Sequence, residues 1–262
     1  MGRLKSILII GFGLMLSPAF AQTTISNGSK PNLSNEPAKK GTKHKVLIVP
    51  FEPRMYMSQI DHKINAETKW DQKKIKQAVR FGLDEELYKC IKKKQEVISF
   101  LDDTVKYKKD LFKTYGAVQF KFDKIPDQKK YTAPKAEKEK TFVQKGQLMA
   151  DTDNEGKFMN VKVNDNSLLS GFNAKYKTDV FLFINQVDIT TSEIPGALTN
   201  AAQRTITVHY TIFTVAGKEI NSGISSVNFP STVNHPDKIA SSYFSKIAEE
   251  IAMRMEKSLL VN

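Results

Sequence analysis

The feature that most constrains this sequence is an uninterrupted apolar run, Val180-Phe181-Leu182-Phe183-Ile184. Successive side chains of a strand point to opposite faces, so a strand without a polar residue must be covered on both sides. The run therefore predicts a central strand between two layers. Downstream, Thr205–Phe213 alternates apolar and polar residues, and Lys218–Phe229 follows the turn Ala216-Gly217. This pattern predicts a β-hairpin.

Two long amphipathic helices are predicted, one before and one after these strands. In Thr68–Lys94, and again from Pro236 onward, apolar residues recur every four positions, as in a helix that packs one face. Proline is favoured in the first turn of a helix, which agrees with a start at Pro236. Asp84, Glu85 and Glu86 are expected on the outer face of the first helix. The apolar positions are Ile75, Val79, Leu83, Leu87 and Ile91 in the first helix, and Ile239, Tyr243, Ile247, Ile251 and Met255 in the second.

Shorter elements complete the fold prediction. Lys45–Phe51 is expected as a buried first strand, and Glu96–Leu101 as either a strand or the start of a helix. Asp102–Tyr115 and Leu168–Tyr176 are expected as helices, and Thr191–Ala202 as a loop. The predicted class is α/β (α+β): a mixed β-sheet covered by two or more long amphipathic helices, with a C-terminal β-hairpin followed by a closing helix.

The first 21 residues have the pattern of a cleaved secretory signal peptide. Arg3 and Lys5 precede the apolar run Ile7–Leu16, and Ala19-Phe20-Ala21 provides the small residues of a cleavage site before Gln22. A membrane anchor is the alternative, but this run is about half of the ~20 apolar residues that span a bilayer. No cysteine follows the cut directly, so the chain is not expected to be a lipoprotein. We expect a periplasmic protein.

The rest of the chain is predicted to form one domain. Residues 22–43 are polar and are expected to be a disordered leader. Residues 44–262 are expected to be a single α/β domain with a lysine-rich insertion at about residues 115–157. Within it, Ala117–Phe122 is strand-like, whereas the lysine-rich stretch Asp127–Lys145 has a low apolar content and is expected to be an exposed loop without a packed core. Phe158–Val163, which follows, is expected as a short strand.

The net charge and the cysteine content limit the disulfides and the classes of partner that we expect for this chain. The chain has a formal net charge of +12 and one cysteine, Cys90, so it has no intramolecular disulfide. Cys90 lies among apolar residues and is expected to be a buried, inert thiol. A nucleic acid partner is not expected behind a signal peptide. Anionic glycan or lipid is the physically sensible alternative to a lysine surface that is merely solvated.

Known catalytic and metal-binding patterns are not matched, so we expect no cofactor and no metal. Asp151–Gly156 imitates the start of a calcium loop, but Lys162 stands where the bidentate glutamate is required. The four histidines have no metal-binding spacing, and His209 is expected to be a surface or cross-strand residue. Asp179 and Asp188 flank the central strand, where catalytic pairs occur, but their separation is not visible in the sequence.

Two sets of residues are candidates for binding. Arg54, Met55, Tyr56 and Met57 follow the first strand, where α/β proteins often place binding loops. Together with Ile194, Pro195 and Leu198 they are candidate contacts for a partner protein. The candidate contacts for a polyanion are Lys129, Lys130, Lys135, Lys138, Lys140 and Lys145.

The order of these motifs resembles a family of envelope domains. The motifs are Val49-Pro50-Phe51, Thr178–Ile184, Tyr210–Phe213 and Gly217–Ile220, before a closing helix. They are similar to the periplasmic α/β domain of the TolB amino-terminal domain, curli secretion-channel lipoproteins and lipoprotein activators of penicillin-binding proteins. Asn185-Gln186 stands where that family often has glycine, and the lipid-bearing cysteine is missing.

The resemblance implies binding to an envelope protein rather than catalysis. We therefore expect a non-enzymatic protein-interaction component of cell-envelope assembly or maintenance, with no transmembrane segment in the mature chain. Two alternatives stay open: a hydrolase or transferase that acts on an envelope polymer, and a binder of anionic glycan or lipid through the lysine-rich segment.

Overall fold

The fold is described from a computed structural model. It describes residues 43–134, 141–144, 147–150, 156–165, 167–195 and 202–261, all within a unit that spans residues 41–262. The predicted signal peptide, nearly all of the leader, and four of the candidate lysines lie outside the described residues. Those lysines are Lys135, Lys138, Lys140 and Lys145.

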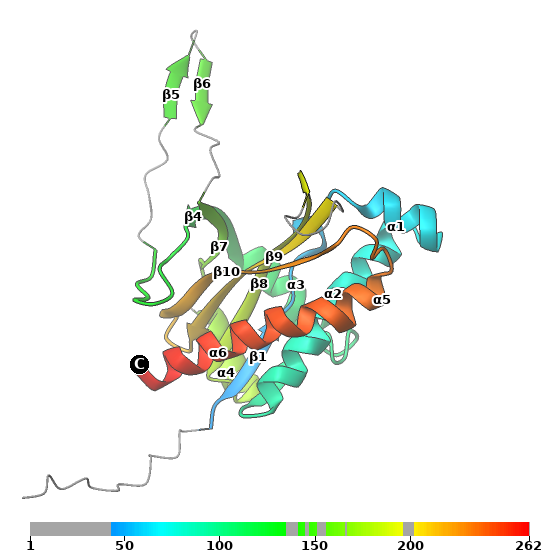
Figure 1. Cartoon of the computed structure of the whole chain (residues 1–262). Helices are drawn as coiled ribbons and strands as arrows, with labels where there is room; N and C mark the ends of the chain where they lie inside the picture. The colour runs from blue at the N-terminus through cyan, green and yellow to red at the C-terminus, as the bar shows by residue number, and fades with distance from the viewer. Residues whose placement is uncertain are drawn as a thin grey trace, which may run out of the picture. The chain divides into compact units, whose positions relative to one another are not determined.

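A mixed sheet of six strands organises the domain (Figure 1). Its order is β10-β9-β8-β1-β3, and β2 pairs with β8 beyond the end of β1. Strand β1 is parallel to both of its neighbours, whereas β9 is antiparallel to both β8 and β10. The strands are β1 (Lys45–Val49), β2 (Tyr56–Ser58), β3 (Glu96–Ser99), β8 (Val180–Pro195), β9 (Ala202–Thr214) and β10 (Glu219–Pro230).

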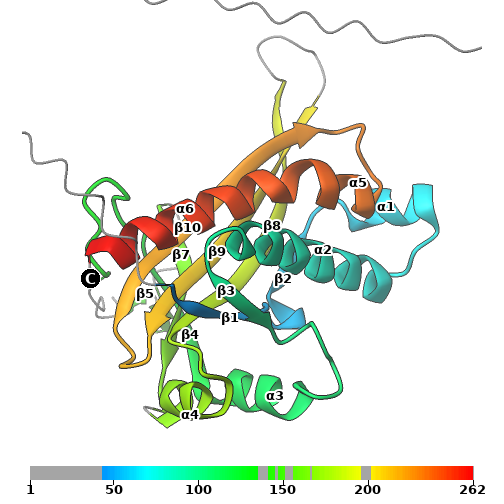
Figure 2. The same cartoon turned by 90° about the horizontal axis from the view of Figure 1, so that it is seen from below.

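Helices cover both faces of this sheet (Figure 2). Helices α2 (Gln72–Lys92) and α6 (Ser245–Val261) lie side by side on the first face, where they share one apolar core with the sheet. Helices α3 (Lys108–Ala117) and α4 (Ser167–Tyr176) pack with a second apolar core on the other face. The remaining helical segments are η1 (Pro53–Met55), α1 (Asp61–Thr68), α5 (Pro236–Ile239) and the π-helix η2 (Ala240–Phe244).

The predicted fold class and its central strand are confirmed. Val180, Leu182 and Ile184 belong to the first core, whereas Phe181 and Phe183 belong to the second. The register of β8 against β9 shifts between Ile184 and Gln186, so Asn185 is the extra residue of a β-bulge. This bulge reverses the alternation of faces, and for this reason Ile184 and Val187 both reach the first core.

A second sheet packs on the face opposite α2 and α6. It consists of β4 (Val118–Lys124) and β7 (Lys157–Val163) in antiparallel register. Val118, Phe120 and Val161 join the second core. The strand-like piece Ala117–Phe122 and the short strand Phe158–Val163 that the sequence predicts are therefore confirmed as parts of β4 and β7. The expected loop Asp127–Lys145 is wrong over Thr141–Gln144, which forms a strand. Strands β5 (Thr141–Gln144) and β6 (Gln147–Ala150) pair with each other.

Two other boundaries differ from the sequence predictions. The chain forms turns at residues 102–106, and α3 begins only at Lys108. The predicted loop Thr191–Ala202 is wrong over residues 191–195, because β8 continues to Pro195, which pairs with Ala202. Glu96–Leu101, for which two possibilities were left open, contains strand β3.

A short segment, residues 125–134, crosses the outer edge of β10; we call it the strap. Gln128 Nε2 donates to the carbonyl oxygen of Ser222 at 2.7 Å, and the Tyr131 hydroxyl donates to Glu219 Oε1 at 2.5 Å. The next residue of β10 is Gly223, with φ of 141°. A Cβ there would lie 2.8 Å from Gln128 Nε2, so glycine allows the strap to approach the strand.

Candidate binding site at the carboxyl ends of the parallel strands

The chain leaves the carboxyl ends of β1 and β3 in opposite directions. Strand β1 leads to α2 on the first face of the sheet, whereas β3 leads to α3 on the second (Figure 2). In open α/β sheets, the crevice at such a switch point is the usual place for a ligand. The candidate site is therefore expected among the side chains at this edge.

Arg80 of α2 and Tyr115 of α3 meet over the end of β1. Arg80 Nε donates to the carbonyl oxygen of Phe51 at 2.9 Å, and Arg80 Nη2 donates to the Tyr115 hydroxyl at 2.6 Å. The Tyr115 hydroxyl in turn donates to the carbonyl oxygen of Pro50 at 2.8 Å. Burial raises the pKa of Tyr115 to about 12, so the phenol keeps its proton. Together these bonds hold the Arg80 guanidinium in one position.

Asp84 lies one turn further along α2 and is buried. Its Oδ1 accepts a hydrogen bond of 2.7 Å from the Ser99 hydroxyl at the end of β3. Burial raises the pKa of Asp84 to about 7. The prediction that Asp84 lies on the outer face of the helix is wrong, because β3 covers this side of α2 and Ser99 supplies a polar partner.

An open hollow of about 360 Å³ adjoins Arg80. One face of the first turns of α2 lines it, together with Pro53 from the turn after β1. Of the described residues in this lining, three are cations and none is acidic. The α2 residues are Gln72, Lys73, Lys76, Gln77 and Arg80.

The loop that carries Pro53 contains the first set of predicted contacts. Arg54 is exposed and pairs with Glu52 at 2.8 Å. Tyr56 is buried, and its hydroxyl donates to Asp61 at 2.8 Å, whereas Met57 on the opposite side of β2 is 55% exposed. Met55 is half-buried. Met57 is thus the apolar side chain that this loop offers to a partner.

The second set of predicted partner contacts lies at the end of β8, the strand that pairs with β2. Strand β2 pairs with β8 at Val187–Ile189, and the backbone N–H of Thr191 donates to Gln59 Oε1 at 2.9 Å. Ile194 and Pro195 are the last two residues of β8. Leu198 lies outside the described residues.

The two strand-end aspartates are not a pair. Asp179 accepts hydrogen bonds from the backbone N–H of Lys45 at 2.7 Å and from His44 Nδ1 at 2.6 Å. Asp188 contacts Gln186 and His209 instead. At ~3.3 Å per strand residue, roughly 30 Å separates the two aspartates. Each therefore has its own local role.

His209 is a cross-strand residue and is buried rather than exposed. Its Nδ1 accepts a 2.9 Å hydrogen bond from the backbone N–H of Met159, so its Nε2 carries the proton and donates to Asp188 at 2.8 Å. His209 of β9 is thus hydrogen-bonded to β7 through Nδ1 and to β8 through Nε2. Among the described residues, no cluster of three His, Cys, Asp or Glu side chains has the geometry of a metal site.

Lys129 and Lys130, the described members of the polyanion set, are exposed on the strap. They line a second hollow, of about 290 Å³, at the end of α6. Sequence reasoning missed Arg80, Asp84, Ser99 and Tyr115, which come from different elements. The position of Arg80 and Asp84 one turn apart on α2 was the signal available in the sequence.

Comparison with known proteins identifies no family. No family model matches the chain, and no curated protein matches it. Two of the solved structures that it resembles are the hypothetical protein CT253 from Chlamydia trachomatis and the lipoprotein GNA1162 from Neisseria meningitidis. The first has 11% identity and a TM-score of 0.38, covering 84% of this chain and 100% of the other. The second has 12% identity and a TM-score of 0.35, covering 80% and 99%.

These likenesses are too low to carry an argument about the site. Within the part of the chain that the structure describes, no helix has both the length and the apolar character needed to cross a bilayer. The function proposed below therefore depends on this chain's own residues.

Proposed function

We propose that this protein is a non-enzymatic component of a bacterial cell envelope that binds a partner protein at the carboxyl end of β1. The binding surface comprises the hollow beside α2 and the loop with Met57. The partner segment is acidic with an apolar residue. The signal-peptide pattern of residues 1–21 supports export to the periplasm.

The observation that carries this proposal is the cationic hollow beside α2, whose lining residue Pro53 belongs to the same loop as the exposed Met57. Lys73 and Lys76 lie one turn apart on α2, and Arg80 follows with its guanidinium fixed by Phe51 and Tyr115. A fixed cation loses little conformational entropy when a carboxylate binds it. Met57 is flexible and polarizable, and such side chains adapt to a partner's apolar surface.

The polar groups around the crevice favour binding over catalysis. Tyr115 is held protonated and donates to a backbone carbonyl, and Asp84 accepts from Ser99. Both therefore act in support of the framework. Lys73 is exposed, and Lys76 is half-buried with its ammonium 5.9 Å from the centre of the Tyr56 ring. Both line the hollow, where an acidic partner can reach them.

Site-specific photocrosslinking in cells tests the proposal. A photoreactive amino acid at Met57 should give an adduct with one envelope protein. The same replacement at Met253, which is 63% exposed on α6, is the matched control and should not give that adduct. In the Met57 derivative, Lys73→Glu with Lys76→Glu should lower the adduct yield about tenfold, equivalent to about 1.4 kcal/mol.

Two results would contradict the proposal. One is the same adduct from positions 57 and 253, and the other is an adduct yield that charge reversal leaves unchanged. Cell fractionation in the same experiment should recover the protein in the periplasm with Gln22 as its first residue.

A further inference from the structure

The end of α6 forms a second cationic surface, which we call the basic groove. It is the hollow of about 290 Å³ where the strap, the start of β10 and the last turns of α6 converge. Of the described residues that line it, four are cations and none is acidic. These cations are Lys129 and Lys130 of the strap and Arg254 and Lys257 of α6.

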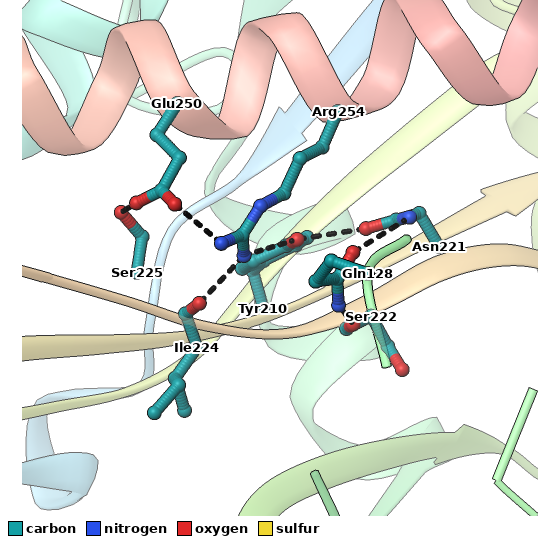
Figure 3. Close-up of polar contacts among 8 residues, drawn as sticks. All are labelled: Gln128, Tyr210, Asn221, Ser222, Ile224, Ser225, Glu250 and Arg254. Carbon is teal, nitrogen blue, oxygen red and sulfur yellow. Dashed lines mark hydrogen bonds and ion pairs between the residues drawn. The ribbon is translucent and has the colours of Figure 1, made fainter. Parts of the chain in front are cut away.

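The directional polar groups of the groove are already bonded to one another (Figure 3). Arg254 Nη1 donates to the carbonyl oxygen of Ile224 at 2.6 Å and to the Tyr210 hydroxyl at 3.1 Å, while Nη2 pairs with Glu250. Arg254 therefore anchors α6 to β10. Its charge is largely offset by Glu250.

The amide side chains are engaged in the same way (Figure 3). Asn221 Oδ1 accepts from the Tyr210 hydroxyl at 2.7 Å, and Asn221 Nδ2 donates to Gln128 Oε1 at 3.2 Å. Gln128 Nε2 donates to the Ser222 carbonyl oxygen. Recognition of individual sugar hydroxyls needs free, well-oriented donors and acceptors, and these amides are committed to the fold.

Three lysines and two apolar side chains remain available. Lys129, Lys130 and Lys257 are exposed, and in the described part of the chain no hydrogen bond or ion pair engages their ammonium groups. Beside them at the end of α6, Leu260 is 78% exposed and Val261 is 80% exposed. Ammonium groups act as point charges and make few geometric demands on an anion.

From this combination we propose that the basic groove docks on the surface of an anionic phospholipid bilayer. The three ammonium groups contact lipid phosphates, and Leu260 and Val261 enter the boundary between headgroups and acyl chains. Exposed cations next to exposed aliphatic residues are the features of interfacial binding. Each lysine near an anionic leaflet strengthens binding about fivefold, so the three together contribute roughly 100-fold.

Vesicle sedimentation tests this proposal with the purified protein. Vesicles of phosphatidylglycerol and phosphatidylcholine should sediment the protein, whereas phosphatidylcholine vesicles should not. The triple variant Lys129→Gln, Lys130→Gln, Lys257→Gln should bind roughly 100-fold more weakly. Leu260→Ser with Val261→Ser should also weaken binding. Raising the salt concentration should release the wild-type protein, because exposed charges are screened within about 8 Å at physiological ionic strength.

A second triple variant of equal charge provides the matched control. Lys63, Lys93 and Lys108 are exposed on other elements, and their replacement by Gln should leave vesicle binding within about twofold of wild type. An equal loss in both triple variants would overturn the proposal, because binding would then follow net charge alone. Binding to a soluble carboxylated polysaccharide but not to vesicles would also overturn it.

The vesicle assay is independent of the proposed protein partner. Lys73→Glu with Lys76→Glu alters the surface at the carboxyl end of β1 and leaves the groove intact. This variant should give about tenfold less crosslinked adduct and still sediment with anionic vesicles. A negative result in the crosslinking experiment therefore does not change the interpretation of the vesicle assay, and the reverse also holds.

Discussion

At the scale of single residues, Asp84 makes stability depend on pH. Its pKa in the folded protein is raised to about 7 by burial, from an ordinary value of 3.8. Between these two values the unfolded chain releases the proton and the folded protein keeps it. Unfolding is therefore increasingly favoured as pH rises through this range.

We predict that the free energy of unfolding falls by up to about 4 kcal/mol between pH 4 and pH 7 because of Asp84. The two pKa values differ by about three, and each pKa unit corresponds to about 1.4 kcal/mol. Asp84→Asn keeps an oxygen that accepts from Ser99 and cannot ionise, so it should remove most of this slope. Urea denaturation at pH 4 and pH 7 measures the difference.

The neighbouring Glu85 is exposed and serves as the control, since Glu85→Gln should leave the slope in place. A slope that Asp84→Asn does not change would show that another group causes it. The burial of Asp84 could not be predicted from the sequence. Its place in the acidic run Asp84-Glu85-Glu86 indicates an outer helical face, and only the pairing of β1 with β3 brings Ser99 against it.

At the scale of elements, the closing helix contains a turn that its sequence did not reveal. The spacing of four predicts one continuous helix from Pro236, but the π-helix η2 adds a residue to the turn at Ala240–Phe244. Ile239 and Phe244, five residues apart, are therefore both buried, and Tyr243 is only partly buried. Gly82 of α2 permits the close approach, because a Cβ there would lie 2.6 Å from the Ala240 Cβ.

The helix after this turn should contribute strongly to stability. Ile247 is 1% exposed in the first core, so Ile247→Ala should cost about 2–4 kcal/mol through lost burial and a residual cavity. Met253→Ala, on the exposed side of the same helix, should cost less than about 0.5 kcal/mol. Urea denaturation midpoints measure both changes, and equal midpoints would mean that α6 is peripheral.

Elements with a regular apolar pattern could be predicted, whereas the polar end of β8 could not. The central strand, the hairpin and the two long helices follow from residues such as Phe181 and Ile247, which alternate or recur regularly. The end of β8 was missed because Thr190–Glu193 is polar and resembles a loop. Its pairing with β9 supplies the backbone hydrogen bonds that make it a strand.

At the scale of the whole molecule, polar contacts join the second sheet to the first. Asn185 Nδ2 donates to the carbonyl oxygen of Met159 at 2.9 Å and to Thr211 Oγ1 at 2.8 Å. The Thr211 hydroxyl donates to Asn160 Oδ1 at 2.6 Å. The β-bulge at Asn185 is what directs this amide toward β7. Sequence reasoning noted Asn185 only as a departure from glycine.

We predict that Asn185→Ala loosens β7 before it affects the opposite face. Loss of the amide leaves the Met159 carbonyl without this donor, at a cost of about 1–3 kcal/mol. Amide hydrogen exchange in β7 should accelerate, while fluorescence of Trp70, the only tryptophan, should still report the native first core. Thr190→Ala, at an exposed position of β8, is the control. Simultaneous loss of both signals under native conditions would contradict this order.

The strap also affects how copies of the protein behave toward one another. Strand β10 is the last of its sheet, and an unprotected last strand is a template on which further strands of other molecules can assemble. Here the outward carbonyls of Ser222 and Ile224 are occupied by Gln128 and Arg254. Growth of the sheet from one molecule into the next is therefore blocked along this half of the strand. A chain that lost the strap would show the change first as turbidity in concentrated solution.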